Sequence, residues 1–271
     1  MKLDSNRAWK HAAGNVSRNR DALLAVAGVF FLLPQLALAL FFPQPEPAVG
    51  MSEQQIVQLA QGYYLSTLPA MIPLVVCQAL GTLTLLGLLS HAARPTVGEA
   101  LRMGVAGLLT YLGAQILLGL GVGIAGGLVL GLLAALGGAA LGIAGLLLVV
   151  LLAVAVALRV SLAGAVVAIE GERRPLRALR RSWMLTAGNA WRLLGFYALF
   201  LVAFMVVLMI VSLVIGIPLQ MIATGGVAAI GTALVSSILN ALMAMYLVAI
   251  IEAVHHQLAG PGIEQERRTF E

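Results

Sequence analysis

The sequence predicts an all-α, polytopic integral membrane protein. Six transmembrane helices form three hairpins, and amphipathic interfacial helices lie on the cytoplasmic side. Hydrophobic residues make up 61% of the 271 residues, charged residues only 10%, and the mean hydropathy is +1.01. Soluble domains carry about a quarter charged residues. The composition therefore excludes a soluble domain and a nucleic-acid-binding domain, despite a pI of about 9.9. The single cysteine, Cys77, can form no intrachain disulfide.

The charge-free segments of the chain supply the spans, because a transmembrane helix needs about 20 apolar residues. Residues 103–158 carry no charge. As one helix, at about 1.5 Å per residue, they would be far longer than a membrane is thick. They must therefore fold back, and we expect the turn in the Ala- and Gly-rich segment 132–140. Within a single membrane domain, 1–271, the six spans are expected at residues 22–42, 63–90, 103–131, 141–169, 193–217 and 227–251.

The basic residues predict the orientation, because cytoplasmic loops are enriched in Lys and Arg. Six spans place the N-terminal segment 1–21, the second and fourth linkers and the tail 252–271 on one side. That side receives all 16 Lys and Arg residues, whereas the charges of the opposite side are Glu46 and Glu53. We therefore expect both termini in the cytoplasm.

Two cytoplasmic segments have the pattern of amphipathic helices. Trp9 shares an apolar face with alanines, and Trp183 shares one with leucines, while basic residues lie on the other faces. Such helices lie in the membrane interface, with basic side chains among anionic lipid headgroups. They are either anchors for the flanking spans or a lipid-responsive or partner-docking surface. The candidate lipid contacts are Trp9, Arg177, Arg180, Arg181 and Trp183.

The same two segments share a spacing. Arg-x-Trp-x-x-x-Ala-Gly-Asn occurs at residues 7–15 and again at residues 181–189. The match suggests a repeated unit, in which a short cytoplasmic helix precedes a transmembrane hairpin.

Small residues recur every fourth position along the third span. In lipid, small residues allow two helix backbones to approach closely. The stripe favours packing between the third and fourth spans; a seam between identical copies and the wall of a pathway are the alternatives. The four glycines of this stripe are Gly119, Gly123, Gly127 and Gly131.

Arg159 is the only charge inside the fourth predicted span. An arginine at this depth is costly unless it is paired or its side chain extends to the interface. Its best available partner is Glu252, near the cytoplasmic end of the sixth span. We expect either a structural role of this kind or a site for a substrate or lipid headgroup.

The chain contains no GxxxxGK[ST] phosphate-binding loop, no GxSxG elbow, no HExxH motif and no Cys/His cluster. We therefore expect no enzymatic activity, no cofactor and no metal. The leading hypothesis is a non-enzymatic membrane protein in envelope or lipid homeostasis. It would act through contact with membrane lipids, anionic headgroups among them, or with a membrane-protein partner or a second copy, and not with nucleic acid. The alternative is a small transporter or channel with a pathway near Arg159, Gln115 and Asn240.

Three short segments carry a resemblance to a known family. They are Gly14-Asn15 with Arg18-Asn19, then the run Met-Ser-Glu-Gln-Gln at 51–55. The most specific is Leu-Arg-Arg-Ser-Trp-Met-Leu-Thr at 179–186, followed by Asn189 and Arg192. They resemble the YciC family of bacterial inner-membrane proteins, whose function is not established. The run at 179–186 is also similar to the membrane domain attached to some glycerophosphodiester phosphodiesterases. The resemblance covers nearly the whole chain. It implies six spans in the bacterial plasma membrane, and it supplies no catalytic residues.

Overall fold

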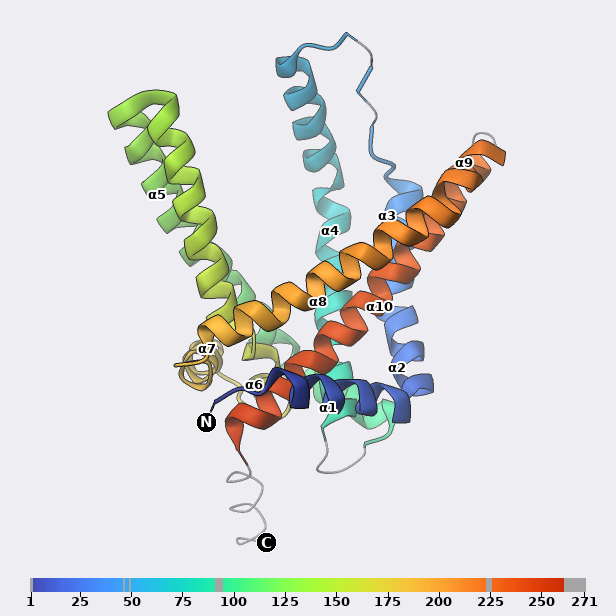
Figure 1. Cartoon of the computed structure of the whole chain (residues 1–271), viewed down its shortest axis with the longest axis vertical. Helices are drawn as coiled ribbons and strands as arrows, with labels where there is room; N and C mark the ends of the chain where they lie inside the picture. The colour runs from blue at the N-terminus through green and yellow to red at the C-terminus, as the bar shows by residue number, and fades with distance from the viewer. Residues whose placement is uncertain (1, 46, 49, 91–94, 223–225, 261–271) are drawn as a thin grey trace, which may run out of the picture.

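The computed structural model describes residues 2–45, 47–48, 50–90, 95–222 and 226–260, and these residues form helices without strands. Six helical segments are long and apolar enough to cross a membrane, which agrees with the predicted number, and each overlaps one predicted span. The segments are Arg20–Phe41, Glu53–Leu89, Val97–Gly137, Ala140–Ala168, Ala190–Leu219 and Gly226–Ala259. Their helices are α2 (Arg20–Ala27), η1 (Gly28–Leu32), α3 (Leu33–Phe41), α4 (Glu53–Leu89), α5 (Val97–Val160), α6 (Ala163–Ala168), α8 (Ala190–Val211), η2 (Ser212–Gly216), α9 (Ile217–Ile222) and α10 (Gly226–Ala259). Two shorter helices, α1 (Ser5–Arg18) and α7 (Pro175–Leu185), lie at one end of the molecule (Figure 1).

α5 doubles back on itself, as Figure 1 shows. The third and fourth candidate spans meet between Gly137 and Ala140, inside the segment where we expected the turn. The two arms are in close contact. A Cβ atom at Gly126 would lie 2.8 Å from Cγ1 of Val149 on the opposite arm. A side chain at Gly126 would therefore push the arms apart.

Two spans contain a short π-helical segment before a proline. Pro34 follows η1 and Pro218 follows η2. A proline has no backbone N–H, and its ring clashes with the carbonyl four residues earlier. That carbonyl belongs to Phe30 in the first case and to Val214 in the second, and both residues lie within the widened turns. Each widened turn thus includes the carbonyl with which its proline would clash, and both helices continue beyond the proline, whereas Pro69 and Pro73 lie inside α4 without a π segment.

The core lies at the end of the molecule that carries α1 and α7. α1 packs across the last turns of α10 (Figure 1). Ala8 and Ala12 of α1 and Ala249 and Ala253 of α10 are completely buried. The apolar face of α1, predicted to rest on lipid, is thus covered by protein instead. Trp9 remains 41% exposed at its edge and stacks on Tyr246, with 6.5 Å between ring centroids.

The two segments with a shared spacing differ in structure. Gly14 lies inside the continuous helix α1, which ends at Arg18. Its counterpart Gly188 has a φ of +76° and lies in the turn between α7 and α8. The shared spacing therefore does not correspond to one local conformation.

Candidate functional site

Small residues on one face of α7 fix the position of this helix. Pro175 is its first residue, where the missing N–H costs no helical hydrogen bond. Ala178 and Ser182, one turn apart, are fully buried, and α7 contacts both α5 and α6. The opposite face of α7 is consequently left open.

Hydrogen bonds tie α7 to the end of the fourth span. α5 ends at Val160 and α6 starts at Ala163, so a break interrupts the span that we predicted to run to 169. Ser182 Oγ donates to the Arg159 carbonyl at 2.9 Å and accepts from the Leu162 amide at 3.1 Å. Thr186 Oγ1 lies 3.0 Å from the same carbonyl, and its one proton is shared with the Ser182 and Trp183 carbonyls at 3.0 and 3.2 Å. Such bonds satisfy backbone groups that a helix break frees where water is scarce.

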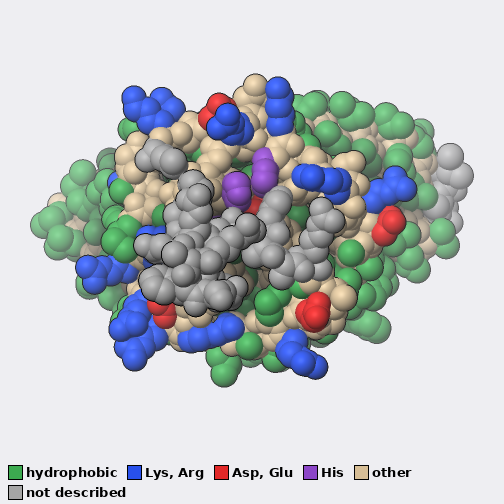
Figure 2. Space-filling model, turned by 90° about the horizontal axis from the view of Figure 1, so that it is seen from below, with side chains coloured by type: hydrophobic (Ala, Val, Ile, Leu, Met, Phe, Trp, Pro, Cys, Tyr) green, Lys and Arg blue, Asp and Glu red, His purple; other side chains and the backbone are tan. Residues whose placement is uncertain are grey.

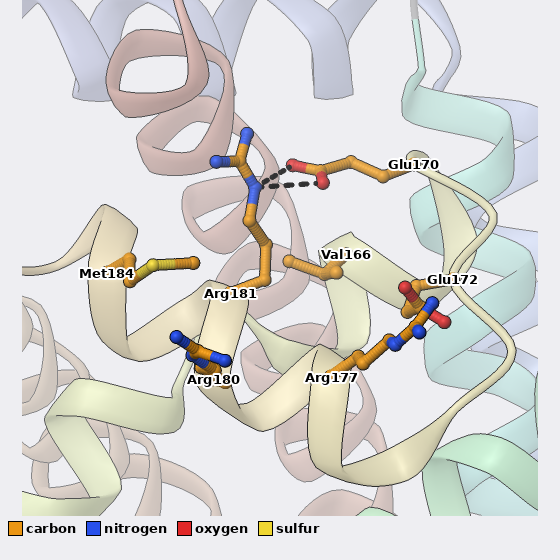
Figure 3. A pocket seen from close by; sticks show the side chains of 7 residues that line it. All are labelled: Val166, Glu170, Glu172, Arg177, Arg180, Arg181 and Met184. Carbon is orange, nitrogen blue, oxygen red and sulfur yellow. Dashed lines mark hydrogen bonds and ion pairs between the residues drawn. The ribbon is translucent and has the colours of Figure 1, made fainter.

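A pocket of about 300 Å³ lies beside α7. We call it the α7 pocket. Figure 3 shows that Arg177, Arg180, Arg181 and Met184 reach it from α7, and that the remaining side chains come from α6 and the following loop. Its lining residues are Val166, Glu170, Glu172, Arg177, Arg180, Arg181 and Met184.

Glu170 and Arg181 form an ion pair in the α7 pocket. Arg181 Nε donates to both carboxylate oxygens of Glu170, at 3.0 and 3.3 Å (Figure 3). His255 Nε2 of α10 lies 2.9 Å from Glu170 Oε1, and this histidine is 4% exposed. Burial raises the pKa of Glu170, but the hydrogen bonds from His255 and Arg181 outweigh it and leave the pKa below its usual value. Glu170 is thus ionised, and it connects the loop before α7 to α10.

Arg177 and Arg180 are the available cations of the α7 pocket. Both are exposed, and neither forms an ion pair within the described part of the chain. Guanidinium groups bind phosphate through planar pairs of N–H donors. Figure 2 shows this end of the molecule, with Lys and Arg side chains spread around its rim and hydrophobic side chains farther out. The predicted residues Arg177, Arg180 and Arg181 therefore share one pocket, and of the three Arg181 alone forms an ion pair among the described residues.

Arg159 and Trp183, two other predicted site residues, meet next to α7. The Arg159 guanidinium carbon lies 5.3 Å from the centroid of the Trp183 ring, a cation–π arrangement. The Trp183 side chain is 46% exposed. Trp9, by contrast, lies on α1 against α10 and lines no part of this pocket.

The predicted pair of Arg159 and Glu252 is not among the ion pairs of the described residues. Because α5 ends at Val160, Arg159 occupies the last helical turn, beside α7. Glu252 is 2% exposed and faces α1. Asn15 Nδ2 donates to it at 3.4 Å, and His11 Nε2 lies at the same distance.

Sequence reasoning did not assign the histidines to any site. His255 is buried and lies 2.9 Å from Glu170 Oε1, whereas the half-buried His11 stacks on the exposed His256 with 4.9 Å between ring centroids. The available signal was the placement of His255 three residues after Glu252 on one helix. That spacing puts both side chains on neighbouring faces of α10.

The glycine stripe of the third span lies on the outer face of α5. Cβ atoms built at Gly119, Gly123, Gly127 and Gly131 would have no atom within 4 Å. The expected packing between the third and fourth spans therefore does not involve them. Close contact between the arms comes instead from Gly126 and from other glycines outside the stripe.

The residues suggested for a transport pathway have different neighbours. Gln115 is exposed and donates to the Tyr111 hydroxyl at 2.9 Å. Arg159 lies over Trp183, and Asn240 is exposed on α10. Within the described part of the chain, no hydrogen bond, ion pair or ring contact joins the three.

Comparison with known proteins gives one result. A family model described as a domain of unknown function, DUF7847, matches residues 4–258. No curated protein and no solved structure matches the chain.

Proposed function

We propose a function for this chain, which belongs to the DUF7847 family, from the side chains of its α7 pocket. It is a non-enzymatic, multi-pass membrane protein that holds phosphate-bearing lipid headgroups there and serves envelope or lipid homeostasis. The observation that carries the proposal is the pair of exposed arginines, Arg177 and Arg180, which line the pocket without an ion pair in the described part of the chain.

The outer face of α7 supports binding of a lipid over a soluble anion. Leu176 is 69% exposed, Met184 52% and Trp183 46%. Exposed apolar side chains next to arginines are the composition of a helix that lies in a membrane interface. A phosphate bound by Arg177 and Arg180 would place the rest of the lipid along this apolar face.

The location of the pocket follows from the proposed orientation. We place both termini, α1 and α7 in the cytoplasm, because all 16 Lys and Arg residues belong to that side if the six candidate helices cross the membrane. The resemblance to the YciC family supports a bacterial inner membrane as the site of the protein. The α7 pocket would then face the inner leaflet, where anionic lipids attract basic side chains.

The test is lipid binding by purified full-length protein. Arg177→Gln with Arg180→Gln should lower the amount of phospholipid that co-purifies and is detected by native mass spectrometry. The loss should exceed tenfold, because two charged hydrogen-bond donors to phosphate are removed, each worth about 1.5 kcal/mol or more.

The matched control removes two positive charges elsewhere on the same end of the molecule. Lys2 and Lys10 are exposed and lie outside the α7 pocket, so Lys2→Gln with Lys10→Gln should change binding less than twofold. Equal losses in the two double variants would show general electrostatic attraction and would contradict a site at α7.

A further inference from the structure

The α7 pocket carries an available negative charge as well as positive ones. Glu172 lines the pocket together with Arg177 and Arg180. Its Oε1 accepts the Arg174 backbone N–H at 2.9 Å, and it forms no ion pair within the described residues. The other carboxylate, Glu170, is already bound to Arg181 and His255. The pocket therefore offers two guanidinium groups and one carboxylate to a ligand.

We propose that the α7 pocket recognises an aminoethyl phosphate group, the headgroup of phosphatidylethanolamine. The phosphate binds to Arg177 and Arg180, and the primary ammonium binds to the Glu172 carboxylate. This inference rests on the proposed function and adds the ligand class.

The charge of Glu172 disfavours a ligand with phosphate alone. A phosphate entering the α7 pocket would approach this carboxylate, and like charges placed together lower affinity. A ligand that carries an ammonium two carbons from its phosphate oxygen turns the repulsion into an attraction. An ammonium also has N–H donors for the carboxylate, which a trimethylammonium group lacks.

The size and surroundings of the α7 pocket agree with such a headgroup. Its volume of about 300 Å³ lies at the small end of the range for ligand sites. Met184 and Val166 supply an apolar part of its wall. Met184, Trp183 and Leu176 continue this apolar surface along the outside of α7, where acyl chains would lie.

The experiment compares dioleoyl lipids that differ only in the headgroup. Delipidated full-length protein is titrated with phosphatidylethanolamine, phosphatidylcholine and phosphatidylglycerol, and bound lipid is counted by native mass spectrometry. We expect phosphatidylethanolamine to bind about threefold to fivefold more tightly than the other two, the range for a partly exposed ion pair. Glu172→Gln should abolish this preference and should leave the affinity for phosphatidylglycerol equal or higher.

The control removes a carboxylate outside the pocket. The Asp21 side chain is 91% exposed, and Asp21→Asn should keep the preference for phosphatidylethanolamine. A competition arm with free O-phosphoethanolamine distinguishes the two sources of the group. Displacement of the lipid at millimolar concentration indicates that the headgroup suffices, and no displacement indicates that the acyl chains are needed.

The outcomes separate this inference from the proposed function. Equal binding of the three lipids, unchanged in Glu172→Gln but reduced by Arg177→Gln with Arg180→Gln, would overturn recognition of the amine and leave the phosphate site standing. A preference that survives Glu172→Gln would also overturn it. Lipid binding that is unchanged by Arg177→Gln with Arg180→Gln would overturn the proposed function itself.

Discussion

Ser182 offers the sharpest test of how α7 is attached to the membrane spans. The side chain is completely buried and makes two hydrogen bonds, to the Arg159 carbonyl and from the Leu162 amide. Ser182→Ala leaves the Leu162 amide, whose residue is also fully buried, without this acceptor. An unsatisfied buried donor costs about 1–3 kcal/mol, so we expect a loss of about 2 kcal/mol in the free energy of unfolding.

Thr186 shares one of these acceptors, and this makes the two positions interdependent. Thr186→Val alone should cost about 1 kcal/mol, because the Arg159 carbonyl keeps its bond to Ser182. In the double variant the carbonyl loses both donors. The double variant should therefore lose about 1 kcal/mol more of the free energy of unfolding than the two single variants lose together.

The assay is reversible unfolding of the purified protein in mixed micelles, followed by circular dichroism. Ser66→Ala and Thr232→Val are the matched controls. Their hydroxyls bond only carbonyls of their own helices in the described structure, so each should stay within about 0.5 kcal/mol of the original protein. A Ser182→Ala variant as stable as Ser66→Ala, or strict additivity with Thr186→Val, would refute the role of these hydroxyls in the helix break.

Gly126→Leu should lower the thermal unfolding midpoint by several degrees, whereas Gly127→Leu should leave it unchanged, because of these two glycines Gly126 alone would bring a Cβ within 4 Å of the opposite arm of α5; equal effects would contradict this packing. In a cysteine-free background, a cysteine replacing Glu53 should react with impermeant maleimide added to spheroplasts, and one replacing Arg177 should not; the reverse labelling would overturn the orientation. Folding lowers the pKa of Glu170, so the ionised carboxylate stabilises the fold at a pH above 4.5, the usual carboxyl pKa. This stabilisation is lost as the pH falls through the lowered pKa. The unfolding midpoint of Glu170→Gln should therefore vary less with pH in this acidic range than that of the original protein.

The number and approximate position of the candidate spans were predictable because hydropathy is a local property of the chain. A charge-free run of sufficient length indicates a membrane span whatever it packs against. The break within the fourth candidate span, between Val160 and Ala163, was not predictable in the same way. Residues 161 and 162 lie within an apolar stretch, and an apolar composition does not reveal whether a helix is continuous. The hydroxyl groups that bond the backbone at the break lie twenty or more positions later in the chain.

The direction of each apolar face also depended on tertiary structure. The pattern of α1 indicates that one face is shielded from water, but the same pattern is expected whether lipid or α10 covers that face. The glycines of α5 show a similar ambiguity. Gly126 and Gly127 are adjacent, yet only Gly126 meets the other arm, because the position of the turn determines which face points inward.

The charges near α7 and α10 divide into two groups according to their burial. Glu170, His255 and Glu252 are buried or nearly so, and each has a polar partner. Removing one member of such a set leaves a charge in a medium of low dielectric constant, which destabilises the fold. Arg177 and Arg180 are exposed, and Glu172 is only partly buried. Their replacement removes charge without orphaning a buried partner. A loss of lipid binding in variants of these three residues can therefore be assigned to the pocket, whereas a loss in Glu170→Gln cannot be separated from a change in how the loop before α7 is held on α10.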